Sequence, residues 1–116
     1  MPLAGTTPSV AIGPNDRHYM FDGSEIPAAN VTSQTIARAG LGNDPFTFAI
    51  DFGAVPAATV QVQASNSDIP ANFQMVFTST SKQHDFFSDA NTSWEFYRIV
   101  LSAYTSGGMP VVRVRR

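Results

Sequence analysis

The sequence predicts an all-β protein: an antiparallel β-sandwich of jelly-roll type, with about eight strands and a Pro/Gly-rich N-terminal segment. Three observations support this class. Short runs of alternating apolar and polar residues follow one another from residue 46 to the C-terminus, and this period of two is typical of half-buried strands. Nine Phe, three Tyr and one Trp stand among many Val residues, and aromatic and β-branched residues favour sheets. Turn-forming residues separate the runs.

The N-terminal segment, residues 1–40, is interrupted so often by Pro and Gly that only short strands fit. We expect such strands at residues 9–12, 17–21 and 31–38. The segment can be an extended arm that reaches across a neighbouring subunit, or a set of edge strands and loops. The second interpretation is favoured, because a chain of 116 residues makes one domain, residues 1–116, with little chain to spare.

The pattern is clearer in the rest of the chain. The strands expected there are residues 46–52, 60–64, 73–77, 94–104 and 111–114. Residues 94–104 form the longest run and are apolar on both faces, as a central strand would be. Residues 78–93 are mostly polar, so we expect a long connection in which Phe86 and Phe87 form a short buried anchor.

Charge and cysteine content exclude several functional classes. Seven Lys and Arg stand against nine Asp and Glu, so the net charge of −2 gives no strong field for nucleic acid or a membrane surface. The absence of Cys excludes disulfides, thiolate zinc sites and cysteine nucleophiles. The chain begins without the basic and apolar segments of a signal peptide, and no apolar run approaches the roughly 18 residues of a membrane span. We therefore expect neither nucleic acid nor membrane as a partner.

A catalytic site is not indicated. His84 and Asp85 lie near several serines, which superficially suggests a Ser/His/Asp arrangement. However, a triad depends on three-dimensional geometry, and no Gly-x-Ser-x-Gly nucleophile motif is present. We expect a solvated loop at this position, no catalytic residue and no enzymatic activity.

Metal and cofactor sites are not indicated either. The two histidines, His18 and His84, lack a nearby carboxylate pattern. The oxygen ligands that the connections offer are Asn66, Asp68, Asp85 and Asp89. A calcium loop brings several oxygens and a Gly together within about a dozen residues, which these positions do not. We expect these side chains to form turns, and no metal or cofactor to bind.

The candidate contacts with a partner are Arg113, Arg115, Arg116, Phe86 and Phe87. Arg113 and Arg115 alternate with Val, so their side chains share one face of the last strand. One interpretation is a basic face that docks on an acidic neighbour, and the other is an edge strand that its charges protect against aggregation. Three arginines are too few to indicate nucleic acid. Trp94 could stack on a sugar, but its place at the start of the most apolar strand favours the margin of the core.

Three segments carry a family resemblance. Residues 48–53, Phe-Ala-Ile-Asp-Phe-Gly, end in Asp-hydrophobic-Gly; residues 60–66, Val-Gln-Val-Gln-Ala-Ser-Asn, fit a Val-x-Val-x-x-Ser-x strand; and residues 96–101, Phe-Tyr-Arg-Ile-Val-Leu, look like an Arg-Tyr-Val-Arg-Ile strand. In this order they resemble the galactose-binding-like, or discoidin-like, jelly-roll superfamily. The resemblance covers residues 46–116 and implies a jelly roll, whose sugar- or lipid-binding members use loop residues.

A second resemblance concerns the C-terminal end. The turn Tyr-Thr-Ser-Gly-Gly at residues 104–108, followed by a Val-rich strand, is similar to the end of small tail, fibre and capsid-decorating proteins of bacteriophages. This likeness implies a virion protein made in the host cytoplasm. It agrees with the low charge and the absence of Cys, which would be unusual in a secreted glycan-binding module.

From these observations we expect a non-enzymatic structural protein of a bacteriophage particle. It would be a capsid decoration or cement protein that stabilises contacts between major capsid subunits. The alternatives are a tail or baseplate component and a carbohydrate- or host-receptor-binding module, which would bind a glycan. The expected partners are the major capsid protein or other virion proteins, and further copies of the chain in a dimer or trimer, because sheet edges need cover.

Overall fold

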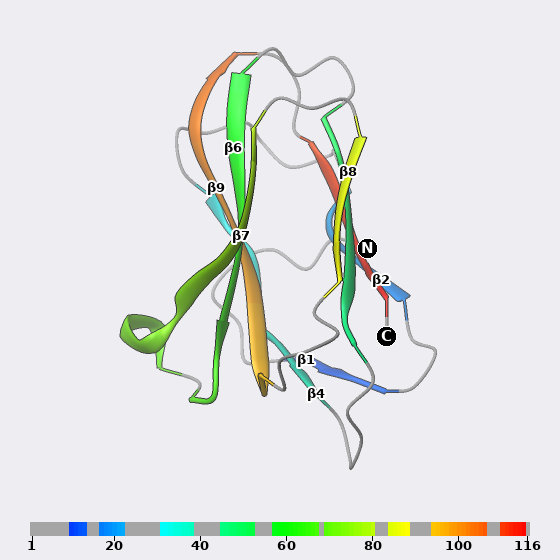
Figure 1. The fold of residues 1–116 in the computed structure, drawn as a ribbon, viewed down its shortest axis with the longest axis vertical. Coiled ribbons are helices and arrows are strands. Elements are labelled where there is room, and N and C mark those ends of the chain that lie inside the picture. The colour runs from blue at the N-terminus through cyan, green and yellow to red at the C-terminus, as the bar shows by residue number, and fades with distance from the viewer. Residues whose placement is uncertain are drawn as a thin grey trace.

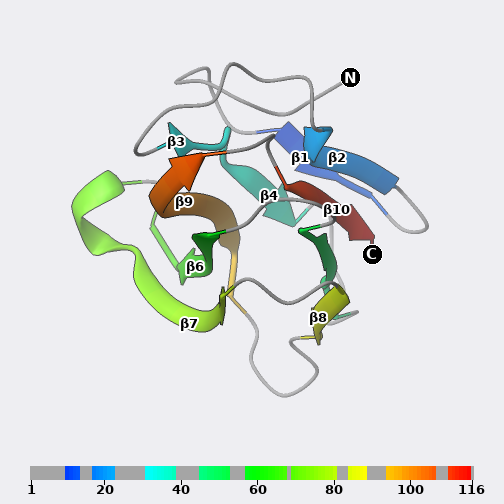
Figure 2. The same cartoon turned by 90° about the horizontal axis from the view of Figure 1, so that it is seen from above.

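The computed structural model describes residues 10–13, 17–22, 31–38, 45–52, 57–67, 69–80, 84–88, 94–106 and 110–115. These residues form two β-sheets that face each other (Figures 1 and 2). In chain order the strands are β1 (Val10–Ile12), β2 (Arg17–Asp22), β3 (Val31–Thr32), β4 (Ile36–Arg38), β5 (Thr47–Asp51), β6 (Ala57–Ser65), β7 (Gln74–Thr80), β8 (His84–Ser88), β9 (Phe96–Ser106) and β10 (Val111–Arg115). The only helical element among the described residues is a 3₁₀ turn, η1 (Pro70–Asn72). No described helix is long and apolar enough to cross a membrane.

The strand order is that of a jelly roll. One sheet has the order β1-β4-β9-β6-β7, with β3 also paired to β9, and the other has the order β2-β10-β5-β8. The antiparallel pairs are nested in the sequence: β6 pairs with β7, β5 with β8, β4 with β9 and β2 with β10. This nesting is one long hairpin, with β6 and β7 at its tip, wrapped over itself into two sheets. The predicted antiparallel jelly-roll sandwich is therefore confirmed, and β1 with β4 is the one parallel pair among the described strands.

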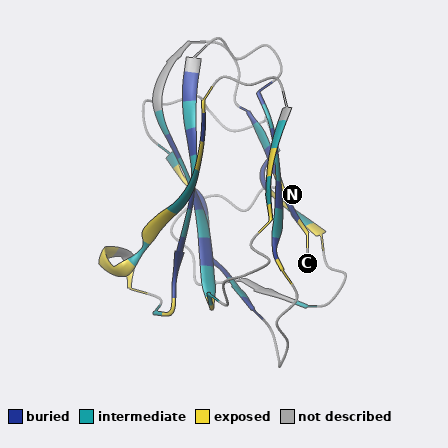
Figure 3. Ribbon diagram, in the orientation of Figure 1, coloured by how far each residue is buried: buried dark blue, intermediate teal, exposed yellow. Residues whose placement is uncertain are grey.

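The core lies between the sheets, where the inward side chains of both layers meet (Figure 3). Alternation puts Phe48 and Ile50 inward on β5, and Tyr97 and Ile99 inward on β9. The ring of Tyr97 packs edge-on to Phe46 at 4.7 Å between centroids and lies 5.6 Å from Phe48. Because these rings come from opposite layers, the cluster holds the two sheets together.

The N-terminal strands belong to this sandwich. The expected strands at 9–12, 17–21 and 31–38 correspond to β1, β2 and the pair β3 and β4. In the described part of the segment, β1 and β2 are edge strands and β4 lies between β1 and β9; residues 1–9 lie outside the description. Ser33, between β3 and β4, is bound to β9: its amide donates to the carbonyl of Ile99 and its Oγ accepts from the amide of Ile99, both at 2.8 Å.

One expectation about strands was wrong, and one of two open interpretations is excluded. Residues 78–93 were expected to be one long connection, but β7 continues to Thr80 and β8 occupies residues 84–88. Both are edge strands with one paired side, so polar residues are tolerated along them. The last strand was a candidate edge, but β10 pairs with both β2 and β5 and is a central strand.

Candidate functional site

The position of β10 decides between the two interpretations of its arginines. Arg113 and Arg115 are exposed on a strand that has neighbours on both sides, so they protect no sheet edge. Their side chains lie on the outer face of the four-stranded sheet, while Val112 and Val114 point into the core. A charged outer face of a central strand is free to meet another molecule.

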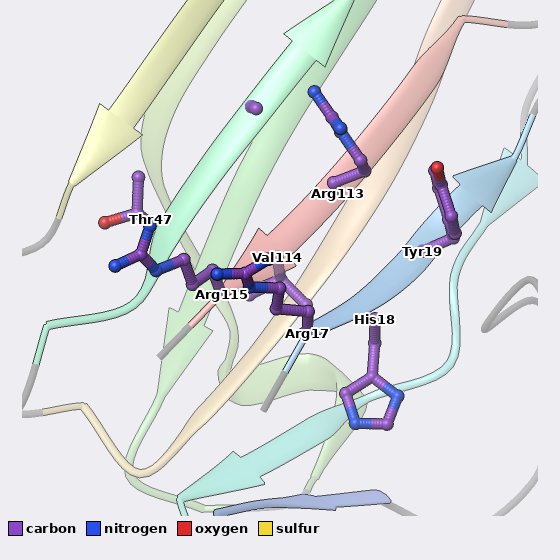
Figure 4. A pocket seen from close by; sticks show the side chains of 8 residues that line it. Arg17, His18, Tyr19, Thr47, Arg113, Val114 and Arg115 are labelled. Atoms are coloured by element: carbon purple, nitrogen blue, oxygen red, sulfur yellow. The ribbon is translucent and has the colours of Figure 1, made fainter. Parts of the chain in front are cut away.

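One row of the face crosses the sheet at Arg115. Arg17 of β2 lies directly opposite Arg115 on one side, and Thr47 of β5 lies opposite it on the other. Thr47 donates a hydrogen bond of 3.2 Å to Ser88 of β8, which completes the row. Two arginines therefore lie side by side on neighbouring strands (Figure 4).

The next row adds two aromatic side chains. Arg113 lies opposite Tyr19 on β2 and opposite Ala49 on β5, and Ala49 lies opposite Phe86 on β8. Tyr19 is 39% exposed and Phe86 is 71% exposed. We call Arg17, Tyr19, Phe86, Arg113 and Arg115 the arginine face. The small side chain of Ala49 separates Arg113 from Phe86 and leaves the surface low between them.

The arginine face is hollowed. An open depression of about 520 Å³ lies over β2, β10 and β5. Its lining residues are Arg17, His18, Tyr19, Thr47, Ala49, Arg113, Val114 and Arg115. Arg113 and Tyr19 extend beside each other, whereas the ring of His18, which lies opposite the buried Val114, points away from them (Figure 4). The depression can therefore receive side chains of another molecule between guanidinium groups and an aromatic ring.

Charge on this face changes sign along the strands. No side-chain hydrogen bond or ion pair joins Arg17, Arg113 or Arg115 to another residue that the structure describes. At the other end of the sheet, Asp22 and Asp51 lie on either side of Val111. Like charges directly opposite each other destabilise a sheet, so a negatively charged ligand over Arg17 and Arg115 would remove an unfavourable interaction.

The other two arginines of the described residues are satisfied within the fold. Arg38 is buried; its Nε donates to the carbonyl of Trp94 at 3.3 Å and its guanidinium lies 4.7 Å from the ring centroid of Phe46. Arg98, on the outer face of the six-stranded sheet, donates to Gln63 Oε1 at 2.8 Å and covers the ring of Phe73 at 4.3 Å. Burial lowers the pKa of Arg98 below its usual value. Arg38 and Arg98 thus have contacts within the fold, whereas the side chains of Arg17, Arg113 and Arg115 have no such polar contacts among the described residues.

Of the predicted contact residues, the structure brings Arg113, Arg115 and Phe86 together on one face. Phe87 lies elsewhere: its ring stacks on Phe77 at 5.0 Å and packs against the core. Arg116 lies outside the described residues. Sequence reasoning missed Arg17 and Tyr19. Their spacing of two in a predicted strand indicates a shared face, but nothing local indicates that β2 lies beside β10.

The predicted loop around His84 is a strand with a structural carboxylate. Ser79 Oγ donates to Asp85 Oδ2 at 2.6 Å, and the amide of Phe86 donates to Asp85 Oδ1 at 2.9 Å. The contact with Ser79 therefore joins β8 to β7, whereas the contact with Phe86 is local. The side chain of His84 is not among the described groups.

The remaining polar candidates also have structural contacts. Asn66 Oδ1 accepts a hydrogen bond of 3.2 Å from the amide of Glu95, which ties the end of β6 to the start of β9. Trp94 is half-buried against the core, as its sequence position predicted. Within the described residues, no three His, Asp or Glu side chains gather as a metal site would require.

No family model, curated protein or solved structure matches this chain.

Proposed function

We propose that the protein is a non-enzymatic structural protein of a bacteriophage particle, a capsid decoration or cement protein that attaches through the arginine face. The observation that carries the proposal is the group of three exposed arginines, Arg17, Arg113 and Arg115, which have no charge partner among the described residues. The choice of a phage particle is supported by the resemblance of the C-terminal strands to those of small virion proteins.

The contacts suit a protein surface rich in carboxylates. Each guanidinium presents a planar set of donors that matches the two oxygens of a carboxylate, and such charge-assisted pairs are stronger than neutral hydrogen bonds. Tyr19 and Phe86 add apolar area beside the arginines. Tyr and Arg are among the residues that contribute most to protein interfaces.

The change of sign along the face defines how the partner must lie. Carboxylates of the partner are attracted to the end with Arg17 and Arg115, whereas the other end carries the carboxylates of Asp22 and Asp51. The face therefore binds an acidic surface in one orientation. It is poorly suited to a nucleic acid backbone, which is negative along its whole length.

A cement function follows from rigidity and copy number. The register of the strands fixes the backbone positions from which the side chains of this face project. A particle offers many equivalent binding sites, so a modest interface repeated over its surface adds resistance to expansion. The mechanism needs no catalytic group.

The test is binding to capsids assembled without the protein. We expect simultaneous replacement of Arg17, Arg113 and Arg115 by Gln to lower affinity at least tenfold, because it removes three charge-assisted contacts. The matched control replaces the same residues by Lys, which keeps the charge but loses the planar donor set, and should lower affinity less. Circular dichroism of each variant reports whether the fold persists.

Salt provides a second measurement. Exposed charges are screened over about 8 to 10 Å at ordinary ionic strength, so binding of the natural protein should weaken as salt rises and that of the Gln variant should change less. Equal binding curves for the natural protein and the Gln variant would contradict attachment through the arginine face. Binding to purified tails, or to a glycan array, without binding to capsids would support the tail or carbohydrate alternative instead.

A further inference from the structure

The outer edge of β7 is a second feature of the surface that calls for a partner. β7 ends the six-stranded sheet, and none of the described strands pairs with its outer side. Every edge strand presents a row of backbone donors and acceptors that fits another strand. Proteins usually block such edges with charge, Pro, shortness or a bulge.

The four sheet edges differ in how they are blocked. β1 has only three residues. β2 carries Arg17 and Asp22, and β8 carries Asp85. β7 has seven residues, Gln-Met-Val-Phe-Thr-Ser-Thr, with neither charge nor Pro. β7 is therefore the longest of these edges, and it carries no charge.

The bulge of β7 leaves part of the edge regular. Val62 lies opposite Phe77 while Gln63 lies opposite Met75, so Val76 is the extra residue of a bulge. From Phe77 to Thr80 the pairing with β6 is continuous. The regular half thus continues the antiparallel order β9-β6-β7 and can accept a further strand.

Apolar side chains are exposed next to this edge. Met75 on β7 is 57% exposed, and Ile69, just before η1, is 54% exposed. η1 projects from the same end of the sheet, where the ribbon is largely exposed (Figure 3). The whole stretch from Ile69 to Thr80 is free of charge. A strand paired to β7 would lie beside this apolar surface.

We propose that β7 pairs with β7 of a second copy of the chain, antiparallel about a two-fold axis near Thr78, so that two six-stranded sheets become one. The charge pattern argues for a second copy. Two chains of net charge −2 repel each other, and an uncharged edge is where identical surfaces meet without opposing like charges.

The pairing is independent of the proposed attachment. It uses no residue of the arginine face, which belongs to the other sheet. A dimer joined through β7 would leave both arginine faces open. Variants of the arginines should therefore remain dimeric, which separates failure of this inference from failure of the attachment proposal.

The first experiment measures mass by light scattering after size exclusion at micromolar to high micromolar concentration. We expect the natural protein to show twice the 12.5 kDa of one chain. Thr78→Lys should raise the dissociation constant of the dimer at least tenfold, because the axis brings the two introduced charges together. The control is Thr32→Lys, an exposed threonine on the same outer face but on β3, and it should leave the dimer intact.

The second experiment uses the absence of Cys in the chain. A single Thr78→Cys variant should give covalent dimers with a short bifunctional maleimide, whereas Thr32→Cys should not, because β9 and β6 separate β3 from β7. A monomeric mass at high micromolar concentration would overturn the proposal. A dimer that resists Thr78→Lys and is not linked through Thr78→Cys would overturn it equally, and loss of that dimer in the arginine variants would place the contact on the arginine face.

Discussion

Ser79 and Asp85 join the two sheets at one side of the sandwich through a hydrogen bond of 2.6 Å from Ser79 Oγ to Asp85 Oδ2. Ser79 lies on β7 and Asp85 on β8, so the bond connects edge strands of different sheets. Beside it, the rings of Phe77 and Phe87 stack at 5.0 Å. Together these contacts close the side of the core that would otherwise open between the two edges.

Ser79→Ala tests the contribution of this bond. Ser79 is only 2% exposed, and its replacement removes one hydrogen bond to the carboxylate of Asp85. We expect the free energy of unfolding to fall by about 1 to 3 kcal/mol in chemical denaturation. The control is Ser88→Ala, which removes an exposed hydrogen bond with Thr47 and should cost much less. Equal losses in the two variants would show that the bond between the sheets adds nothing.

The two faces of β9 should differ in their sensitivity to truncation. Ile99 is fully buried, so Ile99→Ala should lower the free energy of unfolding by about 2 to 5 kcal/mol through lost burial and the cavity left behind. Phe96 is half-buried, and Phe96→Ala should cost less although more atoms are removed. Thermal and urea unfolding of both variants show which substitution costs more free energy of unfolding. A larger loss for Phe96→Ala would mean that the outer face of this sheet is covered.

Adjacent phenylalanines on β8 should have opposite roles. Phe87→Ala should lower the free energy of unfolding by about 1 to 3 kcal/mol, because its ring packs on Phe77 and the core. Phe86→Ala should leave stability almost unchanged, since this side chain is mostly exposed, and should weaken binding to capsids. The paired measurement is urea unfolding and capsid binding for each variant. Reduced stability without reduced binding in Phe86→Ala would remove it from the arginine face.

Relief of repulsion between Arg17 and Arg115 should be measurable in the free protein. The two residues lie directly opposite each other, and like charges in such a pair destabilise a sheet. Arg17→Gln should therefore raise the free energy of unfolding by roughly 0.2 to 1 kcal/mol at low salt. The gain should disappear in concentrated salt, where the repulsion is screened. A loss of stability at low salt would mean that Arg17 has a partner in the folded chain.

Much of the fold could be predicted from local pattern. Alternating Phe and Val residues placed the strands now seen as β5, β6 and β9, and the length and apolar character of β9 placed it centrally. β8 was missed because His84 to Ser88 is short and half polar, and a strand paired on one side needs little apolar sequence. Phe86 and Phe87 were treated as a unit, although strand geometry separates them to opposite faces.

The sequence by itself determined that Arg113 and Arg115 share a face, because side chains alternate along any strand whatever its neighbours. Only the tertiary structure decided what that face contains. Arg17 and Tyr19 lie on this face because β2, near the start of the chain, pairs with β10, near its end. Phe86 lies on it because β5 pairs with both β10 and β8. Such pairings are set by how the two sheets bury their inward side chains against each other, and that depends on residues far apart in the sequence.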